Sequence, residues 1–205
     1  MKLVYGITVS TEKEEVLSLI NFLKSNCDDQ IVVQIDSTKN NDDLFYEIAN
    51  LTKYVYIHPF NNDFSEFKNK LNESCLLYGA DYIFQLDADE MITSKLVNNI
   101  KQILINDGND IDLIYVPRVN RVDGITQEHI NKWKWYMDVF GRINYPDYQG
   151  RIYRSNLKWV NKIHERIDAD INKVAYINHD DYHIVHNKTI QKQEQQNNFY
   201  QNLNA

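Results

Sequence analysis

Asp81-Tyr82-Ile83-Phe84-Gln85-Leu86-Asp87-Ala88-Asp89-Glu90 is the stretch on which the fold prediction depends. Its apolar run, 82–86, ends in a cluster of acids, a pattern typical of a buried strand that carries carboxylates at its carboxyl end. In an open α/β sheet, ligands bind at that edge. The stretch therefore predicts both a central strand and the edge at which a site should form.

The acids after this strand are candidates for a metal site. Side chains alternate along an extended segment, so Asp87 and Asp89 should point the same way, and Ala88 leaves room beside them. Two carboxylates on one side suit a divalent cation such as Mg²⁺ or Mn²⁺. Acids are also favoured in a polar turn or at a helix N-terminus, so the motif alone leaves both interpretations open.

The composition is that of a single globular domain. The chain has 205 residues, 43% of them hydrophobic and 25% charged, which is enough for one substantial core over 1–205. The net charge of -7 argues against nucleic acid as a partner. An anionic ligand would therefore need local neutralisation by a metal or by a few well-placed Lys and Arg residues.

The cysteines and the N-terminus bear on location. Cys27 and Cys75 have no CxxC spacing and are most simply reduced core residues, which suits a cytoplasmic protein. The apolar segment 3–9 is followed by the polar segment 11–15, which does not form an export signal. No apolar run approaches the roughly 18 residues of a membrane helix, so we expect a soluble or peripheral protein without an integral membrane segment.

Strands and helices alternate through the first half of the chain. Strands are expected at 2–9, 30–35, 54–58, 82–86 and 111–116, the last of them stopped by Pro117. Helices are expected between them at 16–23, 44–51, 63–79 and 94–105. The alternation implies right-handed crossovers, and hence an α/β, Rossmann-like fold with a mostly parallel central sheet and helices on both faces.

The third of these helices has clear end signals. Asp63 can cap it, Glu66 follows three residues later as in a capping box, and Gly79 can close it. Lys68 and Asn69 fall off its apolar stripe within the first two turns, where a helix attracts anions. A solvated polar face is the alternative interpretation of these two residues.

The alternation stops at Arg118. Segment 118–150 is rich in aromatic residues without a sustained period, so we expect a partly ordered, irregular region over the sheet. Its aromatic rings could stack on sugars or fill a small core of their own. Short strands are expected at 151–154, 159–167 and 174–177, and a Gln/Asn-rich helix at about 189–203.

Several short motifs, taken in order, resemble a known family. They are the strand 2–9, Asp36-Ser37-Thr38, Phe64-Ser65-Glu66-Phe67-Lys68-Asn69, Leu86-Asp87-Ala88-Asp89-Glu90, Tyr145-Pro146-Asp147-Tyr148-Gln149-Gly150-Arg151, Trp159 leading to His164-Glu165, and His186 with Lys188. Their order and spacing, over nearly the whole chain, are similar to those of family 2 glycosyltransferases, which have the nucleotide-sugar-binding GT-A fold. The similarity is closest to small bacterial and viral members of the lipopolysaccharide-core type.

The resemblance implies a division of a single GT-A domain. Segment 1–117 would be the nucleotide-binding half, 118–187 the acceptor and catalytic half, and 188–205 a C-terminal helix.

The resemblance also implies a donor site. Thr8, Ser10 and Asp36 would hold the nucleoside, with Asp36 reading the base. Lys68, where the family usually has Arg, and Asn69 would lie against the ribose or the diphosphate. Ala88 and Arg151 complete the implied donor-binding set.

A metal site follows from the same resemblance. Asp89 would hold the metal directly, Asp87 would contact the ribose or a metal-bound water, and His186 would complete the coordination. His183 is three residues away, so on an extended segment only one of the two histidines would meet the metal. In a helical turn both could, and motif position favours His186.

The activity implied is a metal-dependent, inverting transfer of a hexose from a nucleoside-diphosphate sugar, with UDP favoured, to a glycan, lipid-linked or other hydroxyl acceptor. Mn²⁺ or Mg²⁺ would neutralise the leaving diphosphate. A carboxylate would take the acceptor proton, and Glu165 is the first candidate and Asp147 the second. Glu165 could instead form a structural ion pair with Arg151 or Arg166.

Other functions fit the sequence less well. An aspartyl-phosphate phosphatase would need Thr or Val where Met91 stands, close to the start of a chain. A nucleotidyltransferase or another Mg²⁺-dependent nucleotide-sugar enzyme would usually carry an early Gly-rich loop, and Gly6 is the only glycine before Gly79. A non-catalytic carbohydrate-binding module would explain the aromatic residues of 118–150 but not Asp87, Asp89 and His186 together.

Overall fold

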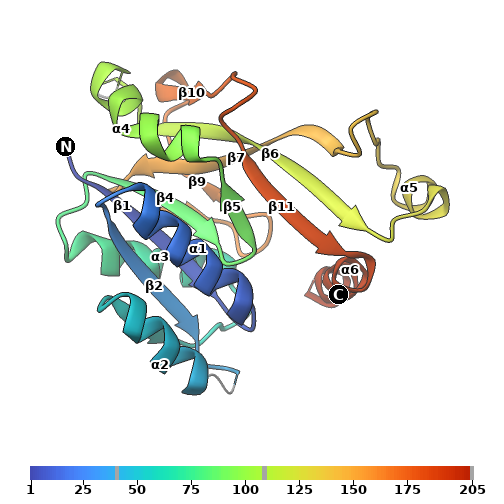
Figure 1. Ribbon diagram of the computed structural model, residues 1–205, viewed down its shortest axis with the longest axis horizontal. Coiled ribbons are helices and arrows are strands. Elements are labelled where there is room, and N and C mark those ends of the chain that lie inside the picture. Colours follow the sequence, from blue (N-terminus) through green and yellow to red (C-terminus); the bar gives the residue numbers. More distant parts are fainter. Residues whose placement is uncertain (40–41, 108–109, 204–205) are drawn as a thin grey trace.

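A mixed β-sheet with helices on both faces forms the body of the protein in the computed structural model, which describes residues 1–39, 42–107 and 110–203 (Figure 1). The strands of this sheet are β1 (Leu3–Val9), β2 (Gln30–Asp36), β3 (Val55–His58), β4 (Tyr82–Asp87), β5 (Glu90–Ile92), β6 (Leu113–Asp123), β7 (Ile143–Arg154), β10 (Val174–Tyr176) and β11 (Ile184–Thr189). The helices are α1 (Lys13–Asn26), α2 (Asp42–Leu51), α3 (Phe64–Leu76), α4 (Ser94–Asp107), α5 (Gln127–Trp133) and α6 (Ile190–Leu203), with a 3₁₀ turn at Ile171–Lys173. A separate pair, β8 (Trp159–Val160) and β9 (Arg166–Ile167), lies outside the main sheet.

The first half of the sheet is parallel, as the alternation predicted. The strand order is β3-β2-β1-β4-β7-β6-β11-β5, and β10 pairs with β6. Strands β3, β2, β1 and β4 run parallel, and β7 runs antiparallel to both β4 and β6. Because β1 lies between β2 and β4, the strand order reverses beside it, and ligands bind at such a switch point.

Alternating side chains of β1 divide the core into two layers. Tyr5 and Ile7 pack in a cluster with buried residues of α1, α2 and α4. Val4 packs in a second cluster with Leu71 and Cys75 of α3. The parallel strands are therefore buried on both faces, which explains why they are continuously apolar in the sequence.

The ends of α3 agree with the sequence signals. The Asp63 carboxylate accepts a hydrogen bond from the backbone N–H of Glu66 at 2.9 Å and so caps the helix. Gly79 has φ +70° and donates its backbone N–H to the carbonyl of Leu76 at 2.9 Å. The left-handed conformation explains the glycine at this position.

Segment 118–150 differs from the prediction. Pro117 does not end its strand: β6 continues to Asp123 and pairs with β7 over most of its length. Pro117 lies between the β6 residues that pair with β10, which end at Tyr115, and those that pair with β11, which begin at Arg118. A residue without an N–H is tolerated there because one side of the strand has no partner strand at that point.

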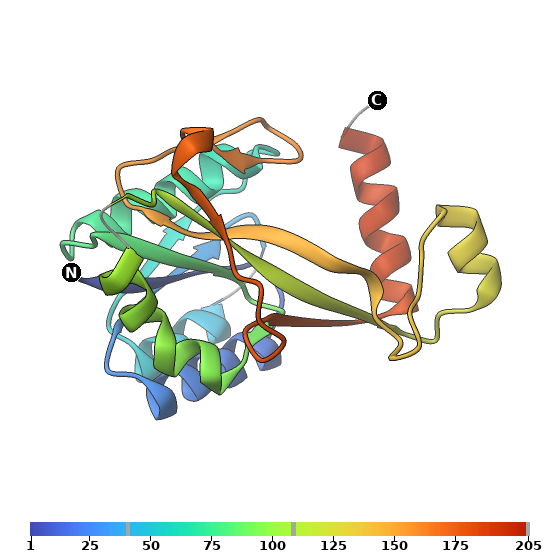
Figure 2. The ribbon, with the colours of Figure 1, turned by 90° about the horizontal axis from the view of Figure 1, so that it is seen from above.

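Segment 118–150 is therefore mostly two long paired strands and not an irregular region. Strands β6 and β7 extend away from β1–β4 as an arm, called here the β6–β7 arm, with β11 paired to β6 as far as Asp123 and α5 at the far end (Figure 2). Val122, Ile130 and Ile143 form a small core in the arm, with Trp135 packed against it. Some of the aromatic residues thus fill a local core, as one of the two interpretations predicted.

The C-terminal half holds two further differences. Segment 159–167 is not one strand, because a turn that contains His164 and Glu165 separates β8 from β9. The expected C-terminal helix is present as α6. No helix in the described part of the chain is long and apolar enough to cross a membrane.

Candidate active site

A cavity of about 1240 Å³ opens at the carboxyl ends of β1, β2 and β4, with α6 and the β6–β7 arm as further walls. Most of the predicted site residues line it: Thr8, Ser10, Asp36, Lys68, Asp87, Ala88, Asp89, Asp147, Arg151, Glu165 and His186. Two predicted residues, Asn69 and His183, do not line this cavity. The fold thus gathers residues from distant parts of the chain at the predicted edge.

Polar side chains at the ends of β1 and β2 form one end of the cavity. Ser10 donates its hydroxyl to Asp36 at 3.1 Å. The other oxygen of Asp36 accepts hydrogen bonds from the backbone N–H groups of Thr38 at 2.8 Å and Phe60 at 3.1 Å. These contacts hold a buried carboxylate in a fixed orientation at the position where the resemblance places a nucleoside contact.

Asp87 and Asp89 contact different partners. Asp87 ends β4, whereas Asp89 lies in the turn before β5, so the prediction that both point the same way along one extended segment is wrong. Asp87 accepts hydrogen bonds from Thr8 at 3.1 Å and from Arg151 at 2.6 Å. Burial opposes the ionisation of Asp87, but Arg151 and Lys68 outweigh it and hold its pKa well below the usual range.

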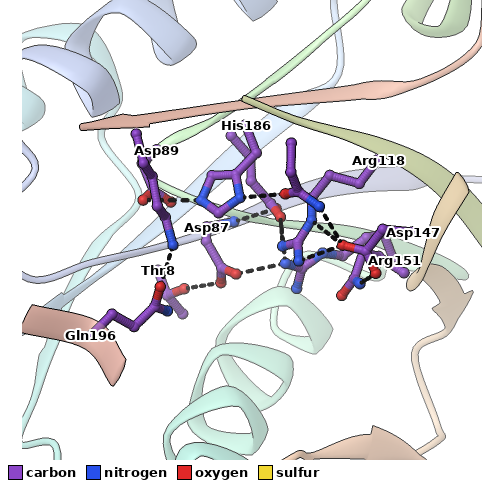
Figure 3. Close-up of polar contacts among 12 residues, drawn as sticks. Thr8, Asp87, Asp89, Arg118, Asp147, Arg151, His186 and Gln196 are labelled. Atoms are coloured by element: carbon purple, nitrogen blue, oxygen red, sulfur yellow. Dashed lines mark hydrogen bonds and ion pairs between the residues drawn. The ribbon is translucent and has the colours of Figure 1, made fainter. Parts of the chain in front are cut away.

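Asp89 and His186 meet although 97 positions separate them in the chain. The Nε2 atom of His186 lies 3.3 Å from Oδ2 of Asp89 (Figure 3). The Lys192 ammonium of α6 lies 3.2 Å from the same oxygen. Burial opposes the ionisation of Asp89, but His186 and Lys192 lower its pKa. The carboxylate is therefore ionised at neutral pH, with the Lys192 ammonium on one side and the His186 ring on another.

The second histidine lies elsewhere. His183 is half-buried and precedes β11, and its Nδ1 lies 2.8 Å from the carbonyl oxygen of Asp180. His186 is on β11 itself, opposite Asn120 of β6 and Glu90 of β5. The structure thus brings His186, and not His183, to Asp89.

Lys68 and Glu165 form an ion pair. Lys68 is only 5% exposed, its ammonium lies 2.6 Å from Oε1 of Glu165 and 4.5 Å from the ring centroid of Trp159. A solvated polar face is therefore wrong for Lys68. Glu165 thus forms its ion pair with Lys68, and not with Arg151 or Arg166 as the sequence had suggested.

Asn69 has a structural role. Its amide nitrogen donates to the carbonyl of Trp159 at 2.9 Å, and its amide oxygen accepts the backbone N–H of the same residue at 2.9 Å. The side chain thus ties α3 to β8 and lies outside the cavity. These contacts leave little capacity for the diphosphate contact that the resemblance implies.

Asp147 is held from several sides. Its Oδ2 accepts hydrogen bonds from Nε and Nη2 of Arg118 at 3.0 and 2.8 Å and from Asn120 at 2.7 Å. Gln149 donates to the other oxygen at 2.7 Å. Burial opposes ionisation, but Arg118 and these hydrogen bonds lower the pKa of Asp147.

Two charged residues of the site were not predicted from the sequence. Arg118 donates to both Asp147 and Glu90, and Arg151 also donates to Glu90 at 2.6 Å (Figure 3). Lys192 comes from a helix whose sequence is mostly polar. The only feature of the sequence that could have pointed to Arg118 is its position directly after the apolar start of β6. The sequence of α6 has no periodic pattern that could have pointed to Lys192.

Asp89 and His186 suit a divalent cation. Carboxylate oxygen and imidazole nitrogen are common metal ligands. The Lys192 ammonium beside Asp89 occupies a position where a positive charge is favoured, as a bound cation would be. Within the described ranges, no group of three or more His, Cys, Asp or Glu side chains is arranged to hold a metal. Mg²⁺ sites usually combine one or two carboxylates with substrate phosphates, so a cation held at Asp89, with His186 beside it, would be shared with a diphosphate.

The fold belongs to the GT-A, Rossmann-like class, as expected. In sequence, the chain matches no family model and no curated protein. In structure, it is similar to S. aureus TarS, with a TM-score of 0.55 and 11% identity over 91% of this chain and 37% of that one. A TarS 1–349 structure in complex with UDP-GlcNAc gives a TM-score of 0.52 and 11% identity over 92% of this chain and 59% of that chain. This protein therefore spans less than two thirds of the TarS chains.

Proposed function

We propose that this protein is a metal-dependent, inverting glycosyltransferase that moves a hexose from a nucleoside-diphosphate sugar to a hydroxyl group of a glycan, lipid-linked or other acceptor. The observation that carries the proposal is the meeting of Asp89 and His186 in a large cavity at the switch point of the sheet. UDP is the favoured nucleotide, and the similar TarS was solved with UDP and with UDP-GlcNAc.

The donor would bind between the strand ends and α6. Ser10 and Asp36 offer a hydroxyl and a carboxylate for the nucleoside, and Arg151 and Lys68 offer positive charge beside Asp87. A divalent cation held by Asp89 and His186 would supply Lewis-acid neutralisation of the leaving diphosphate. Local positive charge is needed because the protein as a whole carries a net charge of -7.

Glu165 is the better candidate for the base. Attack on the anomeric carbon opposite the leaving group inverts its configuration and requires a carboxylate that takes the acceptor proton. Both oxygens of Asp147 already accept hydrogen bonds, and its lowered pKa makes it a weak base. Glu165 lines the cavity, and its ion pair with Lys68 engages a single carboxylate oxygen.

Aromatic side chains in the lining of the cavity suit a sugar acceptor. Trp135 and Tyr148 line the cavity and are partly exposed, and aromatic faces stack on the apolar faces of sugars. Because Tyr148 lies on β7 and Trp135 follows α5, these rings support an acceptor that enters beside the β6–β7 arm.

A donor panel tests the proposal. UDP-, GDP- and dTDP-sugars are incubated with Mn²⁺, and release of the nucleoside diphosphate is measured. We expect slow hydrolysis of at least one donor. Asp89→Ala should abolish this turnover and metal-dependent nucleotide binding, whereas Asp28→Ala, an exposed acid away from the cavity, should change neither.

The base is tested separately. Glu165→Gln should retain nucleotide binding and lose about 10²- to 10⁴-fold in transfer, the usual contribution of a general base. Glu73→Gln on the exposed face of α3 is the matched control. Normal transfer by Glu165→Gln would show that the base assignment is wrong. A nucleotidyltransferase would instead release pyrophosphate from a nucleoside triphosphate, and a carbohydrate-binding module would turn over neither.

A further inference from the structure

We propose that Asn120 is a positioning residue that fixes the ring of His186 with its Nε2 lone pair toward the cation site at Asp89, and that Asp147 in turn fixes Asn120. This inference rests on the proposed function, because it concerns the metal that the transfer would use. It also gives Asp147 a role other than that of a base.

The registers of three neighbouring strands bring these side chains together. His186 of β11 lies opposite Asn120 of β6, and Arg118 of β6 lies opposite Asp147 of β7. The Nδ1 atom of His186 is 2.9 Å from the Asn120 Oδ1 atom, and Asn120 donates its Nδ2–H to Asp147 at 2.7 Å. The chain of contacts is continuous from Asp147 to Asp89 (Figure 3).

The direction of each hydrogen bond follows from the chemistry of Asp147. An ionised carboxylate only accepts hydrogen bonds, and Arg118, which donates twice to Oδ2, favours the ionised form. Asn120 must therefore turn its NH₂ group to Asp147 and its carbonyl oxygen to His186. A carbonyl oxygen is an acceptor, so the Nδ1 atom of His186 must carry the hydrogen.

A hydrogen on Nδ1 determines what the other ring nitrogen can do. In the neutral ring, Nε2 then carries a lone pair, and this atom lies 3.3 Å from Oδ2 of Asp89. Two lone pairs repel each other, so a cation shared between Nε2 and Oδ2 relieves the contact. Histidines that bind metals commonly donate their other ring N–H to an oxygen acceptor, which sets the tautomer and the ring orientation.

Burial makes the orientation specific. The side chain of His186 is 8% exposed, and that of Asp89 is 15% exposed, so water competes little for either atom. The ring is also held by its place between β5 and β6. Loss of the Asn120 acceptor would leave the Nδ1–H group without its partner inside the protein, and the ring could then adopt the other tautomer and donate to Asp89 instead.

Mn²⁺ binding to three variants tests the proposal. Free Mn²⁺ is measured by electron paramagnetic resonance in titrations of the full chain without nucleotide. Asn120→Leu should weaken Mn²⁺ binding about 10- to 100-fold, the usual effect of losing the hydrogen-bond partner of a metal-bound histidine. Asn120→Asp keeps an acceptor for Nδ1–H and should remain within about threefold of the unmodified protein. Asn187→Leu, at the exposed next position of β11, should leave Mn²⁺ affinity unchanged.

A thermal-unfolding measurement separates positioning from a structural role. Asn120→Asp places a second carboxylate beside Asp147 and should lower the melting temperature while metal affinity is retained. If Asn120 had only a structural role, Mn²⁺ affinity and melting temperature would fall together in each variant. Equal Mn²⁺ affinity of Asn120→Leu and the unmodified protein would overturn the proposal, and so would a loss in Asn120→Asp as large as in Asn120→Leu.

A second measurement observes the tautomer directly. Long-range ¹H–¹⁵N spectra with Cd²⁺ as a diamagnetic substitute should show the Nδ1–H form of His186 in the unmodified protein, and the Nε2–H form would overturn the inference. If the unmodified protein bound UDP but no Mn²⁺, this inference would be refuted, but a glycosyltransferase that works without a metal would still fit the result. Failure to bind any nucleotide would refute the proposed function itself.

Discussion

Glu90 joins the charged residues of the site although its side chain has no exposed surface. Its Oε1 accepts hydrogen bonds from Arg118 at 2.9 Å and from Arg151 at 2.6 Å, and its Oε2 accepts the backbone N–H of Asp87 at 3.1 Å. Arg151 is itself 3% exposed. The two guanidinium groups are thus balanced by a buried carboxylate, and their positions in the site depend on it.

Replacement of Glu90 should therefore destabilise the whole protein. Glu90→Gln keeps the size of the side chain but leaves the Arg118 and Arg151 charges without their shared partner, so we expect a loss of about 3 kcal/mol in the free energy of unfolding. Urea denaturation measures this loss. Glu73→Gln, whose pair with Lys70 is exposed, should cost under about 0.5 kcal/mol. A loss of less than about 1 kcal/mol in Glu90→Gln would contradict the account.

The pKa of Asp147 predicts a pH dependence. Because Arg118 and its hydrogen bonds lower this pKa in the folded state, the interaction stabilises the protein above the ordinary carboxyl pKa of about 3.9 and is lost as the pH falls through the lowered value. The difference in unfolding free energy between the unmodified protein and Asp147→Asn should be largest at neutral pH and should shrink below about pH 4. Urea denaturation at several pH values checks this, and a constant difference would show that the charge of Asp147 does not stabilise the fold.

At the scale of elements, α6 forms one wall of the cavity. Near its start, Lys192 pairs with Asp89, and near its end Phe199 and Tyr200 lie beside Phe64 of α3. Burial disfavours the charged form of Lys192, but Asp89 and Glu12 raise its pKa, so the ammonium stays charged at neutral pH. The helix therefore places a positive charge at the atom that would hold a metal.

Lys192 should compete with a divalent cation. Lys192→Met removes the ammonium beside Asp89, and we expect Mn²⁺ affinity in the absence of nucleotide to rise about fivefold, equivalent to about 1 kcal/mol. Lys70→Met on the exposed face of α3 is the control and should have no effect. Calorimetric titration with Mn²⁺ measures both variants. Weaker Mn²⁺ binding by Lys192→Met would show that Lys192 supports the metal site instead of competing for it.

The contact between β1 and α3 requires a glycine. A Cβ atom at Gly6 would lie 3.1 Å from Leu71 Cδ2 and 3.3 Å from Cys75 Sγ, and both side chains are fully buried. Gly6→Ala should lower the free energy of unfolding by about 1 kcal/mol. In combination with Cys75→Ala, which removes one of the close atoms, the cost should be smaller than the sum of the two single changes. Strict additivity in denaturant unfolding would contradict this description of the contact.

The elements that sequence predicted well are those whose signals are local. Asp63 and Gly79 determine where α3 begins and ends through contacts within a few residues. The continuation of β6 past Pro117 was not predictable in this way, because the strand is held by β7 and β11, which come later in the chain. A proline normally ends such a strand, and its tolerance here depends on a gap in pairing that only the assembled sheet creates.

The same distinction holds for the site. Asp89 was a candidate because it follows an apolar run, and His186 was a candidate because of the family resemblance; the structure brings the two side chains together. Arg118 was missed because its partners, Glu90 and Asp147, are 28 and 29 positions away. The structural role of Asn69 was also not predictable, since it comes from backbone groups of Trp159, which is 90 positions away. Side chains whose role depends on a cross-strand or cross-layer partner have no local pattern.

At the scale of the whole molecule, the sheet edge, α6 and the arm surround one cavity in an acidic protein. The parallel strands present Thr8, Asp36 and Asp87 at their carboxyl ends, and the later strands and α6 add the cationic residues that an anionic ligand needs. This division agrees with a donor site that is completed only when both halves of the chain have folded. The geometry of this cavity supports, above all, the metal-assisted binding of a nucleoside diphosphate.

Calorimetric titration of UDP into the full chain tests that claim most directly. With Mn²⁺ present, we expect saturable one-to-one binding that is lost with EDTA and lost in Asp89→Ala, while Asp28→Ala binds as the unmodified protein does. Equally tight binding of UDP with EDTA and in Asp89→Ala, or no binding of UDP, GDP or dTDP under any of these conditions, would contradict the account.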